Sequence, residues 1–338
     1  MKNAVRTVVA ITALTLGLSA CQASFVPSPD PQPAPPEPGP VLSTDRLDGI
    51  LDEIGETLTS ADAATSAEEL SDRITGPARE MRSAEYQLAS ISGGANPVTP
   101  IETEPQVSII PATTAWPRVA GVVTTIPEGT NLPELLTLVQ EDARDPFALW
   151  SWVRLFPGVT VPATTAPVTG SAPVAPDSDT LRFTPQATLE AYVDILNNGD
   201  DSESAGDFEA DPFRTGYAQT VQSLASAVEA AGTATQQSAV GDDGTHSIGT
   251  HEGGAIVVGT VDQVLTVQRT VEDATLTVGP NLAYGGEPGV SGSLIATYLT
   301  TIAFYVPPSD SEEPVTVLGA EQVLMGVERD DSTVPTGE

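Results

Sequence analysis

Residues 293–306 read SLIATYLTTIAFYV, and this stretch indicates the fold class more clearly than any other. Its apolar side chains fall on alternate positions: Leu294, Ala296, Tyr298, Ile302, Phe304 and Val306. Successive side chains of a strand point to opposite faces, so this period of two predicts a long strand with one buried face. Strand character recurs nearby at 255–269, 274–278 and 315–329. The C-terminal part of the chain is therefore expected to form an antiparallel meander.

Helical signals precede these strands. Thr184 followed by Pro185 is typical of a helix start, because threonine caps free N–H groups and proline fits the first helical position. The apolar residues after it, at 189, 192, 193 and 196, share one helical face. A second helix is predicted over 213–230. The glycine-rich, polar stretch around 242–252 is expected to be a loop.

The first half of the chain repeats this order. Apolar residues at 47, 50, 51, 54 and 58 have helical spacing. Ser66 and Glu69 have the spacing of a capping box, which predicts a second helix that continues to Leu88 with a disturbance at Gly76-Pro77. Strands are predicted at 107–110, 116–125, 135–140 and 147–156.

These elements predict an α+β protein of two lobes, each with N-terminal helices packed on an antiparallel sheet. The first lobe is expected over 43–160 and the second over 181–329. Between them, residues 161–180 form a connector rich in Pro, Thr and Ser. Residues 330–338 are predicted to be a disordered tail. Few contacts are expected to cross the connector.

The N-terminus has the features of an export signal. Lys2 and Arg6 precede an apolar stretch at 7–18, which is shorter than the roughly 20 residues that span a bilayer. Leu18-Ser19-Ala20-Cys21 matches the lipobox of bacterial lipoproteins, and Cys21 is the only cysteine of the chain. This match predicts a signal peptide at 1–20 and a lipid on Cys21 that anchors the protein at the outer face of the cytoplasmic membrane.

The segment after the anchor is a predicted stalk within 21–42. Residues 26–40 contain eight prolines, which favour an extended polyproline II conformation. A proline-reading partner is the alternative interpretation of this segment.

The charge balance excludes some classes of partner. Removal of residues 1–20 leaves 11 basic against 46 acidic residues, a formal net charge of −35. Such a charge repels nucleic acid and anionic headgroups, so neither is expected as a partner and the lipid must supply membrane attachment.

Two groups of residues are candidates for binding. Trp150 and Trp152 are two residues apart on a predicted strand, which places both on one face, where they could line a ligand pocket or pack the core. Arg73, Arg79 and Arg82 are the densest basic group and could contact an anion. The alternative for the arginines is pairing with Glu69, Asp72, Glu80 or Glu85 within the chain.

The sequence indicates no catalytic motif, metal site or cofactor. His246 and His251 lie in the predicted loop, where nothing fixes ligand geometry. The acidic stretch 200–211 does not have the glycine and carboxylate positions of a calcium-binding EF-hand. No nucleophile elbow or phosphate-binding glycine loop occurs, whereas paired carboxylates have no sequence signature and stay open.

Several short motifs resemble an uncharacterised family of actinobacterial lipoproteins. They are Ile74-Thr75-Gly76-Pro77-Ala78, Arg82-Ser83-Ala84-Glu85-Tyr86, Thr114-Ala115-Trp116-Pro117-Arg118, and Leu149-Trp150 with Leu155-Phe156-Pro157-Gly158. The likeness spans about 43–329. The order of helices and strands also resembles tandem cone-shaped folds of the NTF2-like or cystatin-like type. The resemblance implies a fold and supplies no catalytic residues.

Together these features favour a noncatalytic binding or scaffolding protein of the cell envelope. Its expected partner is an envelope protein or an apolar small ligand. The alternative is a pocket hydrolase that uses a pair of acidic residues. A pocket with converging polar groups would favour a ligand or catalysis, whereas a filled core with an exposed apolar patch would favour a protein partner.

Overall fold

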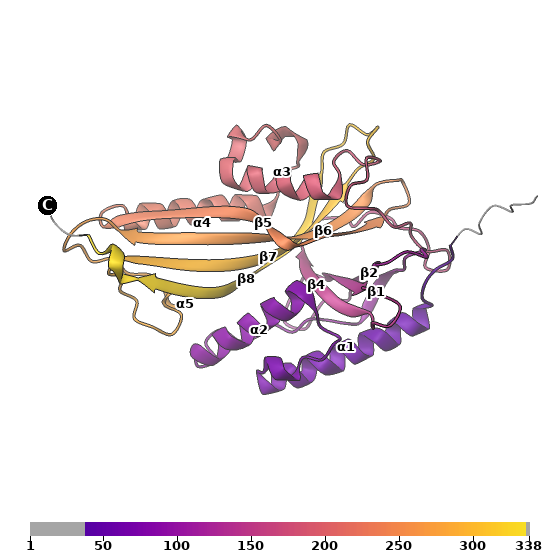
Figure 1. The fold of residues 1–338 in the computed structure, drawn as a ribbon, viewed down its shortest axis with the longest axis horizontal. Coiled ribbons are helices and arrows are strands. Elements are labelled where there is room, and N and C mark those ends of the chain that lie inside the picture. Colours follow the sequence, from indigo (N-terminus) through magenta and orange to yellow (C-terminus); the bar gives the residue numbers. More distant parts are fainter. Residues whose placement is uncertain (1–37, 336–338) are drawn as a thin grey trace, which may run out of the picture. The chain divides into compact units, whose positions relative to one another are not determined.

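The computed structural model describes residues 38–335 of the chain. These residues form one antiparallel sheet of eight strands in the order β1-β2-β3-β4-β8-β7-β6-β5, with helices packed on it (Figure 1). The predicted α+β class with antiparallel strands is confirmed. Residues 1–37, which include the predicted lipid site Cys21, lie outside the described residues.

The first half of the fold contains two helices and four strands. Helix α1 covers Thr44–Ala64 and α2 covers Gly76–Ile91, followed by β1 (Pro105–Ile109), β2 (Arg118–Thr124), β3 (Glu134–Gln140) and β4 (Ala148–Leu155). The capping box at Ser66 begins only a short 3₁₀ turn at Ala67–Glu69, so the helix start predicted there was wrong, whereas the part predicted after Gly76-Pro77 is confirmed as α2. Gly76-Pro77 instead begins α2, because proline has no N–H to leave unpaired in the first turn.

The second half contains α3 (Pro185–Asn198), α4 (Pro212–Val228), β5 (Gly232–Gly249), β6 (Ala255–Arg269), the short α5 (Pro280–Ala283), β7 (Ser293–Val306) and β8 (Thr316–Asp330). The bounds predicted for β6 and β7 and the N-cap at Thr184 are confirmed. Residues 274–278 form no strand and make only an isolated bridge at Thr277.

The glycine-rich stretch expected to be a loop is part of β5, a strand of 18 residues. Its pairing with β6 runs to Val240↔Val261 and resumes at Thr245↔Gly259, so residues 241–244 form a wide bulge opposite Thr260. Gly244 has a φ of +73°, which glycine adopts without strain. Gly241 and Gly244, at the two ends of this bulge, therefore bend the strand instead of ending it.

The two halves of the sheet are continuous. Strands β4 and β8 pair at Arg154↔Ala320 and Leu155↔Gly319, and residues from Pro38 onward form one compact unit. The connector takes part in this unit through backbone hydrogen bonds from Ser171 N to Ile110 O and from Gly249 N to Ala172 O. A division into two separate lobes is not seen in this arrangement.

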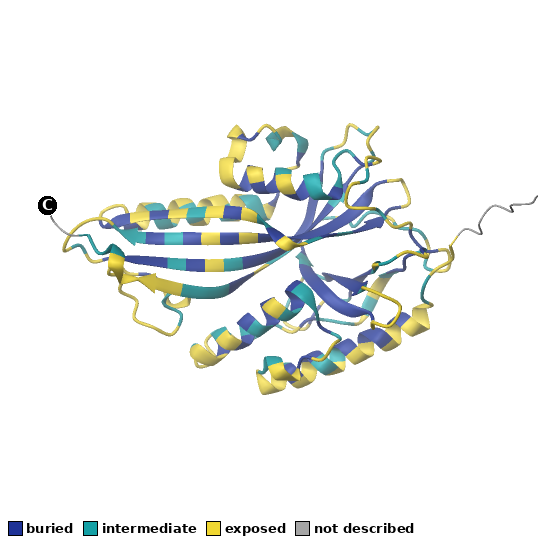
Figure 2. Ribbon diagram, viewed as in Figure 1, coloured by how far each residue is buried: buried dark blue, intermediate teal, exposed yellow. Residues whose placement is uncertain are grey.

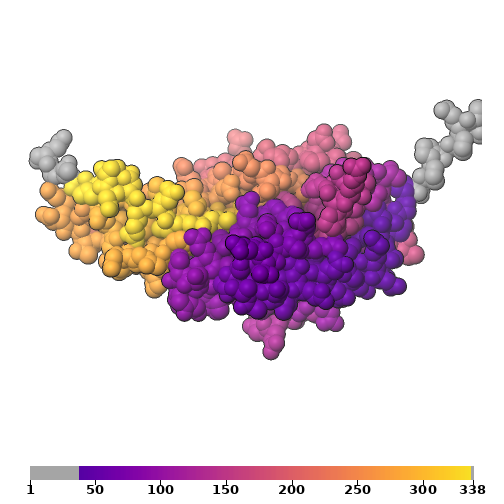
Figure 3. Space-filling view, turned by 60° about the horizontal axis from the view of Figure 1, so that its bottom comes forward, coloured from indigo at the N-terminus to yellow at the C-terminus, as the bar shows by residue number. Residues whose placement is uncertain are grey.

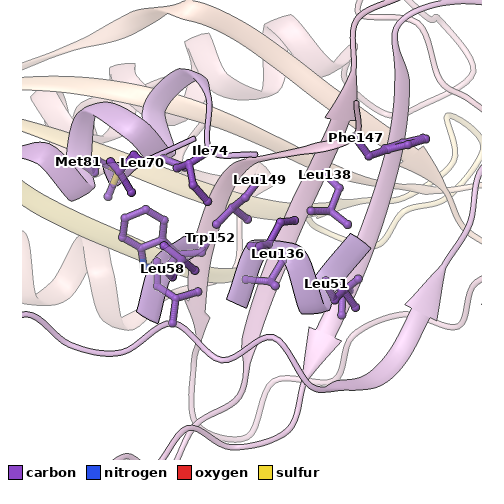
Figure 4. Close-up of a cluster of buried hydrophobic side chains, with 14 of the residues drawn as sticks. Leu51, Leu58, Leu70, Ile74, Met81, Leu136, Leu138, Phe147, Leu149 and Trp152 are labelled. Atoms are coloured by element: carbon purple, nitrogen blue, oxygen red, sulfur yellow. The ribbon is translucent and has the colours of Figure 1, made fainter. Parts of the chain in front are cut away.

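Clusters of buried apolar residues hold the sheet and helices together. Helices α1 and α2 pack on one face of β2–β4, where Leu51, Leu58, Met81 and Trp152 are buried (Figure 4), and they cover this face in the space-filling view (Figure 3). Helix α3 packs on β6–β8. Between the two halves of the sheet lies a cluster that includes Val153 of β4 and Ile256 of β6.

Burial follows the same layout. Buried and exposed residues alternate along the ends of β5, β6 and β7 that lie away from β1–β4 (Figure 2), as expected for a sheet with one covered face.

The first part of the predicted disordered tail is ordered: β8 extends to Asp330, and a 3₁₀ turn follows at Asp331–Thr333. A hydrogen bond of 2.9 Å between the hydroxyls of Ser293 and Thr333 ties this turn to β7.

Candidate functional site

The two tryptophans expected to share a pocket lie on opposite faces of β4. Thr137 of β3 pairs with Ser151, but the next residue, Leu138, pairs with Leu149, so Trp150 is an extra residue in the ladder. Such a β-bulge shifts the alternation of side chains by one. Trp152 is therefore buried under α1 and α2, whereas Trp150 is buried between the halves of the sheet. The prediction of a shared face was wrong for this reason.

Arg73 and Arg79 make contacts within the chain instead of forming an anion site. The Nη1 of Arg73 donates to Phe147 O at 2.7 Å, and its Nη2 forms an ion pair with Glu53. The Nη1 of Arg79 donates to Leu70 O at 2.9 Å. These bonds tie α2 to the segment before it, and that segment to α1 and to the residue before β4. Both arginines thus contact the chain itself, but through other groups than the predicted Glu69, Asp72, Glu80 or Glu85.

Arg82 is fully buried, with 0% of its surface exposed. Its guanidinium donates to both carboxylate oxygens of Asp62, at 3.0 and 2.5 Å, and to Glu85 at 2.9 Å. It also donates to Thr99 O at 2.7 Å. The predicted pairing with Glu85 is present, and no surface remains on Arg82 for an external anion.

An apolar groove of about 370 Å³ lies along the edge of β5. We call it the β5-edge groove. It lies between the end of β5, the segment before β2 and the end of the connector. Its lining residues are Pro111, Thr113, Ala115, Trp116, Pro117, Val119, Ala172, Pro173, Val174, Ala175, Pro176, Thr245, His246, Ser247 and Ile248. Its volume is at the lower end of the range of about 300–1,000 Å³ that is usual for ligand pockets.

Local sequence explains how the walls of the groove are held. The Cζ of Arg118 lies 3.9 Å from the centre of the Trp116 ring, so the cation stacks on the indole and fixes it. A Cβ on Gly121 would lie only 3.1 Å from Ile248, so glycine lets β2 approach the end of β5 closely. Pro173 and Pro176 lack an N–H and cannot continue a ladder along β5.

The edge of β5 is paired at only some of its positions. The side-chain amide of Asn197 in α3 donates to Ser238 O at 2.9 Å and accepts from Ser238 N at 2.8 Å. At the other end, Gly249 N donates to Ala172 O. Pro173 forms an isolated antiparallel bridge with Ile248, so the connector also lies along β5 at this point. Residues 245–248 are where β5 borders the groove.

Two hydroxyls of the groove are buried without a partner. Thr245 and Ser247 are 8% and 6% exposed, and among the described residues neither Thr245 Oγ1 nor Ser247 Oγ forms a hydrogen bond. A buried polar atom without a partner costs about 1–3 kcal/mol.

His246 also lines the groove and is held in its neutral form. Its ring meets Trp150 edge-on, with centroids 4.4 Å apart. Burial lowers the pKa of His246 from 6.5 to about 4, because the charged imidazolium would lose its hydration. At neutral pH the groove therefore presents an uncharged lining in a strongly acidic protein.

A second constellation of ionisable groups lies between α2 and the sheet. Arg154 of β4 forms ion pairs with Glu134 at 3.2 Å and with Glu321 at 3.5 Å. Burial raises the pKa of Glu321 to about 7, against the opposing effect of Arg154. Burial also raises the pKa of Glu134, although this carboxylate accepts from Glu102 N and Arg154. The β5-edge groove does not include either carboxylate.

A smaller cavity of about 250 Å³ lies under α4, between Phe213, Tyr217, Leu265 and Tyr298. The apolar face predicted for α4 is only partly covered, since Val228 is its one buried residue. Behind this cavity the side chain of Gln263 is fully buried and accepts from Thr300 Oγ1 at 2.8 Å. The volume of this second cavity is smaller than that of the β5-edge groove.

Two further properties concern the residues that the structure describes. None of their helices is long and apolar enough to cross a membrane. Among the same residues, no group of three or more His, Cys, Asp or Glu side chains is placed to hold a metal ion.

Sequence reasoning missed the groove and the carboxylates around Arg154. The groove joins residues near 115, 175 and 246, which no local pattern connects. A signal for the carboxylates was present, because Arg154 stands inside the apolar stretch LWSWVRLF and a buried arginine needs an acidic partner. Nothing local shows that this partner is Glu134 or Glu321.

The family described as a domain of unknown function (DUF8094) matches residues 38–329, which include the whole sheet except the last residue of β8. No curated protein and no solved structure matches the chain.

Proposed function

The chain belongs to the DUF8094 family, and we propose that it is a noncatalytic binding protein of the cell envelope whose ligand occupies the β5-edge groove. The observation that carries this proposal is the apolar groove of about 370 Å³, lined mainly by apolar side chains such as Trp116 and Ile248 with a few polar residues among them. A few polar groups in a mostly apolar concave surface are typical of binding sites.

We also propose that Cys21 carries the lipid and holds the folded part at the outer face of the cytoplasmic membrane. The lipobox at 18–21 and the short apolar stretch before it support this proposal. Tethering raises the effective concentration towards a membrane-bound partner, with a gain that depends on the length of the stalk. Intact-mass analysis of the membrane-extracted protein tests it, because a lipidated chain would begin at Cys21 with added acyl mass.

The finer description as two lobes, with folds of the NTF2-like or cystatin-like type, is likewise a proposal. The short pairing between β4 and β8, which joins only Arg154↔Ala320 and Leu155↔Gly319, supports it. If the halves are lobes, hydrogen exchange should show two protection levels, one for β1–β4 and one for β5–β8. A single level across the sheet would contradict it.

The proposed function is tested by complementation of a deletion strain at matched expression. Ala115→Trp fills the β5-edge groove from an exposed position, and Thr114→Trp places the same ring on an exposed neighbour that does not line it. We expect only Ala115→Trp to abolish complementation. A version secreted without Cys21 and a lipidated version without residues 26–40 should also fail. Full activity of the Ala115→Trp protein would contradict the proposed site.

The alternative function is a hydrolase, and one observation favours it. Burial raises the pKa of Glu321 to about 7, so this carboxyl group beside Glu134 could donate a proton to a substrate. Glu134 is however fully buried, with 0% exposed, and substrate cannot reach it without movement of the helices. Complementation by Glu321→Gln would exclude this alternative, and loss of function with native stability would favour it.

A further inference from the structure

The cavity under the first turns of α4 is built from all four strands of the second half of the sheet. We call it the α4 cavity. Three of its residues, Gly216, Thr220 and Gln322, are exposed, so solvent reaches it at the rim. Its lining residues are Pro212, Phe213, Gly216, Tyr217 and Thr220 of α4, Gln236 of β5, Leu265 of β6, Tyr298 of β7 and Gln322 of β8.

The lining of the α4 cavity carries no charge. Among the described residues that line it there is no Asp, Glu, Lys, Arg or His, in a chain with 46 acidic side chains. Burial raises the pKa of Tyr217 and of Tyr298 above the ordinary value of 10, so both phenols are neutral O–H groups at pH 7. A charged ligand would lose its hydration here without an opposite charge to replace it. The cavity therefore favours an uncharged ligand.

Two strand side chains offer free hydrogen-bonding groups to the cavity. The carboxamide of Gln236 and the hydroxyl of Tyr298 form no hydrogen bond to another described residue, and both groups keep contact with solvent. A carboxamide both donates and accepts, which suits the hydroxyls of a sugar, since each of these also donates and accepts. A purely apolar ligand would instead cover these groups and leave them without partners.

A buried residue beneath the cavity holds a third polar group in place. Gln263 of β6 is fully buried, and its Oε1 accepts from Thr300 Oγ1 at 2.8 Å and from Gln322 Nε2. Because the Nε2 of Gln322 is held, its Oε1 is left to accept from a ligand. The ring of Tyr217 is also held, since its hydroxyl lies 2.8 Å from Ser238 Oγ. Groups that are oriented before a ligand arrives lose less entropy on binding.

Aromatic rings and a small volume narrow the ligand class further. Phe213 and Tyr217 stack with centroids 6.2 Å apart and planes at 29°, and Tyr298 adds a ring from the sheet. Aromatic faces are partly negative and attract the weakly positive C–H groups of a sugar ring. The volume of about 250 Å³ lies below the range of about 300–1,000 Å³ for larger ligands. A single sugar ring belongs to this size class.

From these observations we propose that the α4 cavity binds a neutral sugar ring. The ring would lie with one C–H face against the aromatic side chains of α4. Its hydroxyls would bond to Gln236, Tyr298 and Gln322. The α4 cavity and the β5-edge groove have no lining residue in common, so this inference does not depend on the proposed function. A protein with both sites would link a glycan to the ligand of the groove.

The test measures binding of neutral sugars to the full-length protein by saturation-transfer NMR, in a detergent without a sugar headgroup. The panel is glucose, galactose, mannose, arabinose and N-acetylglucosamine. Gly216→Trp fills the cavity from an exposed position, where an added Cβ would meet no atom within 4 Å. Ala218→Trp places the same ring on an exposed neighbour that does not line the cavity.

We expect at least one of these sugars to bind the wild type and the Ala218→Trp protein, but not the Gly216→Trp protein. Binding of no sugar to the wild type, or equal binding to the two variants, would overturn the inference.

Hydrogen bonding to the sugar is tested by Gln236→Leu, which removes the carboxamide and keeps a side chain of similar length. It should weaken sugar binding by about three- to tenfold, the loss expected for one hydrogen bond. Gln237→Leu is the matched control, because Gln237 is exposed and neighbouring residues of a strand point to opposite faces. Equal affinities of the two variants would contradict recognition by Gln236.

Two ligands of related shape test the chemical class. Glucuronate differs from glucose by a carboxylate and should bind about tenfold more weakly or less, because the lining offers no opposite charge. Cyclohexanol has a six-membered ring with a single hydroxyl and should bind more weakly than the best sugar. Tighter binding of cyclohexanol than of every sugar, blocked by Gly216→Trp, would show an apolar pocket and overturn the sugar class.

Discussion

The ring of His246 in β5 meets the indole of Trp150 in β4 edge-on, with centroids 4.4 Å apart and planes at 88°. This contact joins the two halves of the sheet next to the β5-edge groove. It exists because the bulge at Trp150 turns the indole towards the second half of the sheet. Burial of His246 beside Trp150 also keeps the imidazole neutral, and this should make the stability of the protein depend on pH.

We expect His246 to lower the stability of the protein in acid. Its folded pKa is about 4 against an unfolded value near 6.5, so between these pH values only the unfolded chain binds the proton. The free energy of unfolding should therefore fall as pH drops from 6.5 to 4, by up to about 3 kcal/mol from this group. His246→Phe keeps a ring but cannot titrate, so urea titrations should show a smaller loss over this range. An NMR-measured pKa near 6.5 for His246, assigned with His251→Gln, would contradict the prediction.

Glu321 should act in the opposite direction. Its folded pKa of about 7 lies above the ordinary value of 4.5, so between pH 4.5 and 7 the folded state holds a proton that the unfolded chain has lost. Stability from this group is complete below pH 4.5 and is lost as pH rises to 7. Glu321→Gln mimics the protonated form and should raise the free energy of unfolding at pH 8 by about 1–3 kcal/mol, with little gain at pH 4.5. Glu328→Gln, exposed on the same strand, is the control.

Gly76→Ala should destabilise the protein strongly. Gly76 has a φ of +50°, and an added Cβ would lie 2.7 Å from Cδ1 of Trp150. The left-handed conformation and the clash together should cost about 2 kcal/mol or more. Gly49→Ala is the matched control, because Gly49 is exposed in α1 and its Cβ would meet no atom within 4 Å. This substitution should stabilise α1 by about 0.5–1 kcal/mol. Equal effects in thermal denaturation would disagree with the close packing of Gly76 on Trp150.

Asn197, which bonds to the edge of β5, should contribute more to the free energy of unfolding than its neighbour Asn198 does. Asn197→Ala removes two hydrogen bonds to Ser238, which should cost about 1–2 kcal/mol in urea denaturation and favour association through the freed edge. Asn198→Ala removes one exposed bond to Asp194 and should cost less than about 0.5 kcal/mol. Similar costs for the two substitutions would show that Asn197 does not protect the edge.

A protease should cut the connector without separating the two halves. Val168 is 83% exposed, which makes its neighbourhood the accessible part of the connector. The pairing of β4 with β8 and the apolar cluster between the halves remain after the cut. We therefore expect two fragments on a denaturing gel but a single species in native size-exclusion chromatography. Separate elution of the fragments would indicate independent lobes.

Local pattern was sufficient for the elements whose side chains alternate between water and core. The strands β6 and β7 and the start of α3 at Thr184 follow from period and capping alone. Each depends on residues within one or two turns or along one strand, so neighbours in sequence carry the whole signal. The α+β class and the antiparallel arrangement follow from the order of these elements.

Tertiary structure decided what depends on pairing between distant segments. The sequence of β4 alone does not locate the bulge, and only its register against β3 places Trp150 there and separates it from Trp152. Likewise β5 reads as a glycine-rich loop, and becomes a strand because β6 offers a long partner for its backbone. The groove and the partners of Arg154 both arise from such pairings. Sequence by itself determined which segments are helices and apolar strands, whereas long-range backbone hydrogen bonds determined which side chains meet.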